Sequence, residues 1–193
     1  MDLYQSELES PLGVVYVVSD GIHVRAVDFE GYEDRLQRLL ARHYGRYALH
    51  ATSKPGEAVS RLEDYFAGEV RAINAIPVAT GGTPFQRQVW AALRTIPAGT
   101  TVSYGTIAAQ IGRPTACRAV GLANGSNPIG IVVPCHRVIG ANHGLTGYGG
   151  GLERKQWLLE HEGAVPAADS THSKCSTVGV DSPSAVDHAL RGF

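Results

Sequence analysis

The chain has 193 residues and a net charge of −1, and its 44% hydrophobic and 18% charged residues are typical of a globular protein with one large or two small domains. Three cysteines are too few, and odd in number, for a disulfide framework, which favours a reducing compartment. The N-terminus lacks a basic and apolar leader, and no apolar run is long enough to span a bilayer, so we expect a cytoplasmic protein with no membrane contact.

Residues 1–80 are predicted to form strands and then helices. Segments 3–9, 14–19 and 22–29 have strand character and are separated by the turn signals Ser10-Pro11-Leu12-Gly13 and Asp20-Gly21. Apolar residues at helical spacing predict helices over 32–44 and 58–66. Residues 68–82 have few periodic positions and are predicted to be a linker.

From Thr83 onward the pattern is mostly helical. Thr83 is placed to cap a helix that begins with Pro84, Ser103 to cap one that runs through Ile111, and Thr115 to cap one over 116–125. The last two helices, joined by a Gly/Pro turn, match a helix-turn-helix, although short paired helices also occur in proteins that do not bind DNA. Beyond them we expect a short strand or extended run over 129–133, a glycine-rich loop over 144–151 and a final helix over 152–160.

The charges are unevenly distributed between the two halves. Residues 1–80 carry 8 basic and 12 acidic residues, a net −4, whereas residues 81–163 carry 7 and 3, a net +4. No acidic residue lies between Glu69 and Glu153, but six arginines do. An acid-free segment with arginines suits an anionic partner such as nucleic acid. The alternative, on composition alone equally good, is a core poor in polar residues.

The segment Pro134-Cys135-His136-Arg137-Val138 carries the chemistry. A cysteine attacks as its thiolate, which a nearby base or cation makes accessible. Because neighbouring side chains point apart in regular structure, we expect a water bridge between Cys135 and His136. A lone Cys-His pair favours an inert buried cysteine, whereas Pro134 and the charge of Arg137 strengthen the functional interpretation.

A longer stretch carries a specific resemblance. Residues 127–140, Asn-Pro-Ile-Gly-Ile-Val-Val-Pro-Cys-His-Arg-Val-Ile-Gly, resemble the active-site signature of the methylated-DNA–protein-cysteine methyltransferases, or O6-alkylguanine-DNA alkyltransferases. The similarity covers residues 83–163 and includes, in the family's order and spacing, 103–105, 118–121, 145–148 and 158–163. Residues 1–80 resemble the family only in architecture.

The resemblance implies a fold and an activity. The fold would be α+β, with a ribonuclease-H-like domain over 1–80, built on a small antiparallel sheet with helices, and a mainly helical, winged-helix-like domain over 81–163. The activity would be DNA repair by direct reversal, in which an alkyl group such as methyl moves once and irreversibly from O6-alkylguanine to Cys135. O4-alkylthymine is a further candidate substrate. The partner would be double-stranded DNA, no cofactor would be needed, and the chain would be a monomer.

The resemblance also implies roles for five catalytic residues. Cys135 would accept the alkyl group, His136 would take its proton through a water, and Glu162 would hold the imidazole. Asn127 would brace the turn before the acceptor. Tyr104 would contact the base, which must be flipped out of the duplex to reach a buried thiol, and would help to protonate the departing guanine.

The remaining implied residues would bind DNA or line the guanine pocket. Arg118, on the second helix of the helix-turn-helix, would fill the vacated stack from the minor groove. The other DNA-binding residues would be Ser103, Thr115, Ala119 and Arg137, and the pocket residues would be Val138, Tyr148 and Gly149. Gly149 departs from family members that carry a side chain there, which costs only rigidity if the backbone N–H alone binds guanine. Gly130 is also smaller than usual.

Each assignment has an alternative. Tyr104 could pack between helices, Arg118 could be a solvated surface residue, and Glu162 could be exposed at a helix end. A cysteine hydrolase using Cys135 and His136 would turn over and need no DNA. A damage-sensing binder of the alkyltransferase-like type would lack the acceptor cysteine, which is present here.

The sequence offers no metal site. CxxC and HExxH are absent, Cys117, Cys135 and Cys175 are widely spaced, and residues 1–80 contain no cysteine for the N-terminal zinc site of some family members. Residues 164–193, which include Cys175, lack periodicity and are predicted to be a disordered tail.

Overall fold

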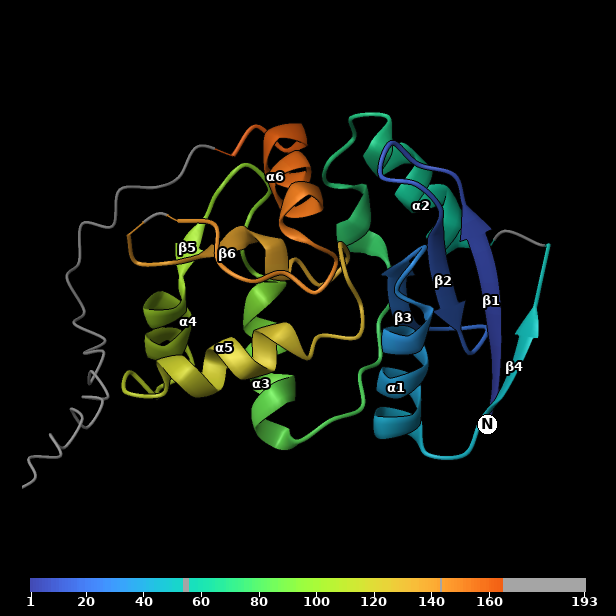
Figure 1. The fold of residues 1–193 in the computed structure, drawn as a ribbon, viewed down its shortest axis with the longest axis horizontal. Helices are drawn as coiled ribbons and strands as arrows, with labels where there is room; N and C mark the ends of the chain where they lie inside the picture. Colours follow the sequence, from blue (N-terminus) through green and yellow to red (C-terminus); the bar gives the residue numbers. More distant parts are fainter. Residues whose placement is uncertain (54–55, 143, 165–193) are drawn as a thin grey trace, which may run out of the picture.

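Four strands form a sheet in the first half of the chain: β1 (Asp2–Leu8), β2 (Val15–Ser19), β3 (Val24–Phe29) and β4 (Ala48–Ala51). In this computed structural model, which describes residues 1–53, 56–142 and 144–164, the strand order is β3-β2-β1-β4 (Figure 1). Strands β1, β2 and β3 pair antiparallel, as their turn signals predict. Strand β4 pairs parallel to β1, so the sheet is mixed and the prediction of an antiparallel sheet was wrong. The chain crosses over through a helix before β4, which gives β4 the direction of β1.

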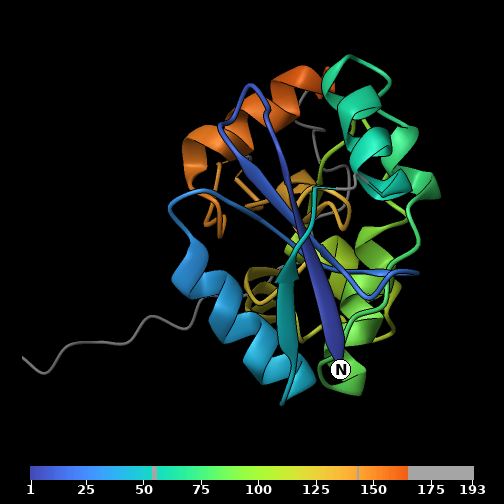
Figure 2. The same cartoon turned by 90° about the vertical axis from the view of Figure 1, so that its right-hand side faces the viewer.

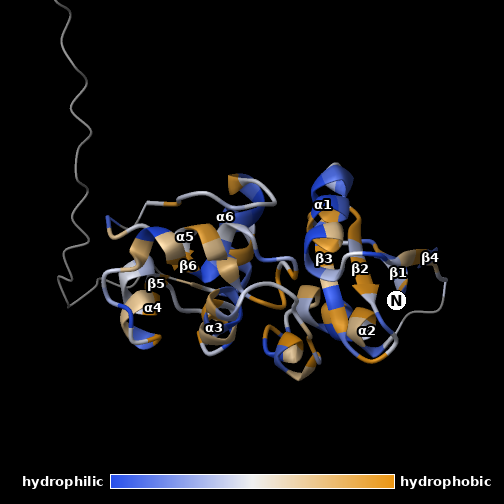
Figure 3. Cartoon of the chain, turned by 90° about the horizontal axis from the view of Figure 1, so that it is seen from below, coloured by the Kyte–Doolittle hydropathy of each residue, from blue (hydrophilic) through white to orange (hydrophobic). Residues whose placement is uncertain are grey.

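Two helices cover the opposite faces of this sheet (Figure 2). Helix α1 (Glu33–Tyr44) packs Leu36 and Leu40 onto one face, in a cluster with residues of β1, β2 and β3. Helix α2 (Glu57–Phe66) contributes Val59, Leu62 and Tyr65 to the main core on the other face. Figure 3 shows both hydrophobic and hydrophilic residues along α1, which is the pattern of a helix with one buried face.

The second half of the chain is mainly helical, with α3 (Pro84–Leu93), α4 (Tyr104–Gln110), α5 (Cys117–Gly125) and α6 (Leu152–His161). Thr83 forms a capping box with Gln86, and Ser103 caps α4, as predicted. The prediction that Thr115 caps a helix was wrong, because α5 begins at Cys117 and its N-cap residue is Ala116.

The segment predicted as a linker is packed. It contains the 3-10 turn η1 (Ala72–Ala75), and Ile73 and Ile76 are each 1% exposed within the main core. The N–H of Val24 in β3 donates to the carbonyl of Pro77 at 2.9 Å, so this segment extends along the sheet before it enters the helical half.

Two very short strands, β5 (Val102–Ser103) and β6 (Val138–Ile139), form a parallel pair in the helical half. Among the described residues, none of the helices has both the length and the apolar character that crossing a bilayer requires. The tail predicted over 164–193 lies outside the described residues except for Ala164.

Candidate active site

The segment that leads to Cys135 is held by the N-terminal sheet. In β3, the N–H of Val27 donates to Pro128 at 2.9 Å, and its carbonyl accepts from Gly130 at 3.0 Å. Ile129 forms an isolated bridge with Val27, but residues 130–133 form a turn in which the N–H of Val133 donates to the carbonyl of Ile129 at 3.0 Å, so the prediction of a short strand or extended run over 129–133 was wrong. Ile131 has a φ of 64°, a left-handed conformation that is costly for a β-branched residue. The surrounding core therefore holds a strained turn shortly before Cys135.

Asn127 braces that turn at both ends. Its side-chain oxygen accepts from the N–H of Ile129 at 3.0 Å, and its amide nitrogen donates to the carbonyl of Val133 at 2.8 Å. The same nitrogen lies 3.2 Å from Sγ of Cys135. Asn127 therefore lies where the resemblance predicts, and its amide also points at the sulfur.

Cys135 begins the 3-10 turn η2 (Cys135–Arg137) and is 6% exposed. Burial raises the pKa of its thiol, while the hydrogen bond from Asn127 and the charges of Arg35 and Lys155 act in the opposite direction. The resting sulfur is therefore a protonated thiol, and it needs a base before it can attack.

His136 follows Cys135 and is fully buried. Its Nε2 is 3.0 Å from Oε1 of Glu162, and both side chains are fully buried. Because a carboxylate only accepts, Nε2 carries the proton and Nδ1 keeps its lone pair. Nδ1 has no protein partner, and burial lowers the pKa of His136, so the imidazole is neutral with one nitrogen open.

Glu162 is the centre of a buried hydrogen-bond network. Besides His136, its carboxylate accepts from the hydroxyl of Tyr65 at 2.8 Å and from Nε and Nη2 of Arg137, each at 2.8 Å. Burial alone would raise the pKa of Glu162, but the hydrogen bonds from His136 and Arg137 lower it to about 2. Glu162 is therefore an anion at neutral pH, as its predicted role requires.

The prediction that Arg137 binds DNA was wrong. Its side chain is 2% exposed, its Nη1 donates to the carbonyl of Ile96 at 2.6 Å, and the rest of its guanidinium holds Glu162. The residue follows Cys135 in a buried turn, so its charge faces the interior.

Tyr104 and Tyr148 lie on the glycine-rich loop side of the site. The hydroxyl of Tyr104 is 3.2 Å from Oγ1 of Thr146 in that loop. The ring of Tyr148 stands edge-on to His136 at 6.4 Å, and its buried hydroxyl has no protein partner. Two buried polar atoms near Cys135, this hydroxyl and Nδ1 of His136, are thus open to a polar ligand or water.

Lys155 is a buried residue that sequence reasoning missed. Its Nζ donates to the carbonyls of Val138 at 2.6 Å and Thr146 at 2.8 Å, which ties β6 to the loop. Burial lowers its pKa to about 8. The signal was its spacing, because Lys155 shares a helical face with Leu158 and Leu159.

The helix-turn-helix presents only part of the predicted DNA surface. Arg118 and Ala119 are exposed on α5, and Thr115 is exposed just before it. Ser103 is 8% exposed, and its hydroxyl accepts from the N–H of Thr106 at 3.1 Å, so its side chain serves the helix cap. Leu122, one turn beyond Arg118, is 77% exposed.

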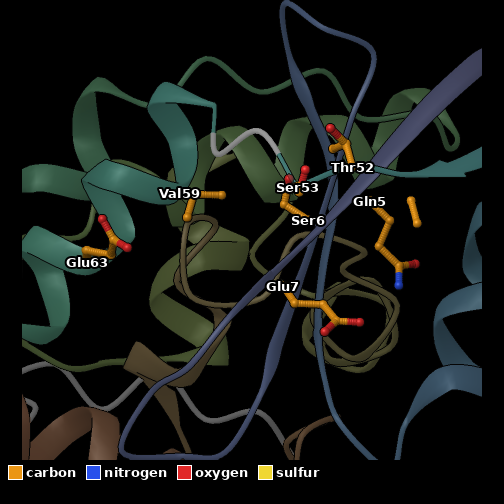
Figure 4. A pocket seen from close by; sticks show the side chains of 8 residues that line it. Gln5, Ser6, Glu7, Thr52, Ser53, Val59 and Glu63 are labelled. Carbon is orange, nitrogen blue, oxygen red and sulfur yellow. The ribbon is translucent and has the colours of Figure 1, made fainter.

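A separate hollow lies in the N-terminal half of the protein. One of about 550 Å³ lies between β1 and α2 (Figure 4) and is lined mainly by polar side chains, among them Gln5, Glu7, Thr52 and Glu63. None of its lining residues belongs to the predicted site. Within the described ranges, no three His, Cys, Asp or Glu side chains are grouped to hold a metal ion.

Comparison with known proteins decides the family. The 6-O-methylguanine DNA methyltransferase ribonuclease-like domain matches residues 3–80, and the DNA binding domain of the same name matches residues 84–164. A relative from Salmonella typhimurium, named methylated-DNA–protein-cysteine methyltransferase, is 54% identical over 164 residues, which are 83% of this chain and 96% of the relative. The chain belongs to the 6-O-methylguanine DNA methyltransferase family.

Other members of this methyltransferase family agree in sequence and structure. A relative with the same name from Mycobacterium tuberculosis is 55% identical over 137 residues, 69% of this chain and 82% of the relative. The crystal structure of Mycobacterium tuberculosis OGT in complex with DNA has a TM-score of 0.69 and 43% identity, covering 86% of this chain and 96% of that one. The O6-methylguanine-DNA methyltransferase of Pyrococcus kodakaraensis has a TM-score of 0.67 and 28% identity, covering 84% and 99%. The predicted α+β fold is confirmed.

Proposed function

We propose that this methyltransferase repairs double-stranded DNA by direct reversal, with Cys135 as the acceptor of an alkyl group from O6 of guanine. The observation that carries the proposal is the buried thiol beside a neutral imidazole that has one open nitrogen and whose other nitrogen donates to an ionised carboxylate. A lone buried cysteine needs none of these partners, so the set favours a nucleophile over an inert residue.

The proton balance follows from the network. The thiol proton passes through a water to Nδ1 of His136, and Glu162 stabilises the resulting imidazolium. The sulfur lone pair forms the S–C bond as the bond from carbon to guanine O6 breaks. The departing guanine takes up a proton from the hydroxyl of Tyr104. The imidazolium of His136 later releases its proton to water and Tyr104 regains one from water, so the net transfer is one proton from the thiol to guanine. The thioether product has no leaving group of comparable quality, so transfer stops after one event.

The pocket and the DNA surface divide the remaining roles. Backbone groups near Val138 and Gly149 bind the guanine edge, and Tyr148 walls the pocket with its hydroxyl available to the base. Arg118 fills the stack that the flipped nucleotide leaves, while Thr115 and Ala119, which are also exposed, contact the DNA backbone. Because the hydroxyl of Ser103 caps α4, Ser103 contacts DNA through its backbone alone.

Three further points belong to the proposal. Residues 1–80 and 81–163 act as two domains, the second of which binds DNA. The chain works in the cytoplasm, since Cys135 is a free thiol and a reducing compartment keeps it so. O6-alkylguanine is the preferred lesion, because both family domains that match this chain are those of 6-O-methylguanine DNA methyltransferases.

Intact mass spectrometry after mixing with an O6-methylguanine duplex tests this function. The protein should gain one methyl group on Cys135 and then stop, and Cys135→Ser should bind the duplex yet gain no mass. Repeated turnover, or hydrolysis of a thioester without DNA, would instead favour a cysteine hydrolase. Methylation of any other residue would remove Cys135 from the mechanism.

A further inference from the structure

The space where a side chain would lie at Gly149 is taken by a residue from the N-terminal half. A Cβ atom added at Gly149 would overlap Nη1 of Arg35 and would lie 2.6 Å from its Cζ. A side chain at position 149 and the guanidinium of Arg35 cannot occupy this space together unless one of them moves. The guanidinium of Arg35 therefore packs directly on the backbone of the pocket loop.

Arg35 is held in this position by a buried carboxylate. Its Nε donates to Oδ2 of Asp28 at 3.0 Å and its Nη2 to Oδ1 at 2.8 Å, a two-pronged geometry that fixes the plane of the guanidinium. Asp28 is 1% exposed at the end of β3, and the ring of Tyr32 lies 5.7 Å from Cζ of Arg35. The arginine is therefore a constrained group rather than a solvated surface residue.

The neighbouring glycines show that the whole loop is docked on this corner of the sheet. A Cβ at Gly150 would lie 2.6 Å from the ring of Phe29, so only glycine allows this approach. Arg154, at the start of α6, donates to the carbonyl of Gly150 at 3.2 Å and stacks over Phe29 at 4.8 Å. The loop contributes its backbone to this contact. The guanidinium groups of Arg35 and Arg154 and the ring of Phe29 pack against that backbone.

We propose that Arg35 is a positioning residue of the acceptor pocket, although it lies in the half of the chain with no predicted site residue. Its guanidinium replaces the side chain that Gly149 lacks, holds the loop 148–151 against β3 and α1, and directs a positive charge toward Cys135. The role rests on the alkyl transfer proposed above, and it assigns the rigidity expected to be lost at Gly149 to a residue far away in sequence.

The charges around the acceptor define what Arg35 adds. Arg35 on α1 and Lys155 on α6 both favour the thiolate. His136 and the hydroxyl of Tyr148 lie on the same side, and Asp28, which is paired with Arg35, and Arg154 both act on Tyr148. Removal of Arg35 takes away one of the two cations that favour the thiolate most and raises the pKa of Cys135. A loss of one pKa unit in thiolate stabilisation corresponds to about a tenfold slower attack at neutral pH.

The test uses single-turnover transfer from free O6-benzylguanine, so that DNA contacts do not contribute. Arg35→Ala is compared with Arg38→Ala, which removes the same charge one turn along α1 from an exposed position. Arg35→Ala should react about tenfold more slowly, with its pH profile displaced to higher pH. Arg35→Lys should return the profile toward that of the unaltered protein, and Arg38→Ala should match the unaltered protein.

A double-mutant cycle tests the shared space. Gly149→Ala should slow transfer in the unaltered protein, because the new Cβ displaces the guanidinium, but should add little to Arg35→Ala. Additive losses, or equal rates for Arg35→Ala and Arg38→Ala, would overturn the proposal. So would a smaller reactive fraction for Arg35→Ala with an unchanged rate and pH profile, since that marks a folding defect. If the unaltered protein takes up neither a benzyl group nor a methyl group from an O6-methylguanine duplex, the proposed function itself has failed; if it takes up methyl alone, the same rates and pH profiles are measured on that duplex.

Discussion

Replacement of Glu162 by glutamine should destabilise the protein and slow alkyl transfer together, because one carboxylate serves both Arg137 and His136. In the folded protein all of its hydrogen-bond partners are donors, including the hydroxyl of Tyr65. An amide brings an NH₂ group of its own, so whichever way it is turned at least one donor faces another donor. The substitution also leaves the guanidinium of Arg137 buried without a counter-charge.

The expected loss of stability follows from the lowered pKa of the Glu162 carboxyl group. A pKa lowered from 4.5 to about 2 corresponds to about 3 kcal/mol of stability at neutral pH. The cost of removing one partner from a buried ion pair is similar, roughly 3–5 kcal/mol. Since the folded pKa is the lower one, this contribution is fully present above about pH 5 and is lost as the pH falls from 4.5 toward 2. General-base assistance is worth roughly 10²–10⁴-fold in rate, so a loss of about 10²-fold is expected.

Urea denaturation and single-turnover transfer measure the two effects on the same samples. Glu160→Gln is the matched control, because Glu160 is exposed on the same helix and accepts from Gln156 at 2.8 Å. The stability gap between the Glu162 variant and the unaltered protein should be constant above about pH 5 and close below pH 4.5. If both variants unfold at the same urea concentration and transfer at the same rate, Glu162 is neither the anchor of Arg137 nor the partner of the base.

Three other substitutions or truncations separate the remaining roles. Arg118→Ala should slow repair of a methylated duplex far more than transfer from free O6-benzylguanine, since a free base needs no flipping; equal losses would indicate a general folding defect. Arg137→Lys keeps the charge but loses the planar fork, so the melting temperature should fall while duplex affinity stays the same; weaker binding at unchanged stability would restore Arg137 to the DNA surface. A chain that ends at Ala164 should keep its single-turnover rate, because Glu162 is the last residue of the proposed site; a sharp fall would show that the tail takes part.

The elements that the sequence predicts well are those whose signal is local. Helical spacing of apolar residues identified α1, α2 and α6, and the caps Thr83 and Ser103 marked two helix starts. Strand β4 was missed because all four of its residues are exposed and carry no alternation of burial. It exists through its pairing with β1, a partner distant in sequence. Strands β5 and β6 have two residues each, too few for any periodic signal.

In the site, the sequence predicts the residue types well, but it does not predict the direction in which each side chain points. The resemblance selected Cys135, His136 and Glu162, and the fold brings them together. Arg137 was predicted to face DNA but faces the interior. A charged residue in a sequence indicates that its charge is either solvated or paired, but the sequence does not show which group pairs with it. Lys155 and Arg35 were missed for the same reason, since each is satisfied by groups that only the tertiary structure brings near it.

The hydrogen bonds between Val27 and the segment 128–130 limit how this acceptor could be transplanted. An engineer who wished to graft the reactive cysteine onto another DNA-binding scaffold would need more than the helix-turn-helix and its following turn. We expect the strained residue Ile131 to keep its conformation only while β3 is hydrogen-bonded to the backbone that precedes it. The smallest portable acceptor therefore includes β3 and the sheet that supports it, which is to say nearly all of the described chain.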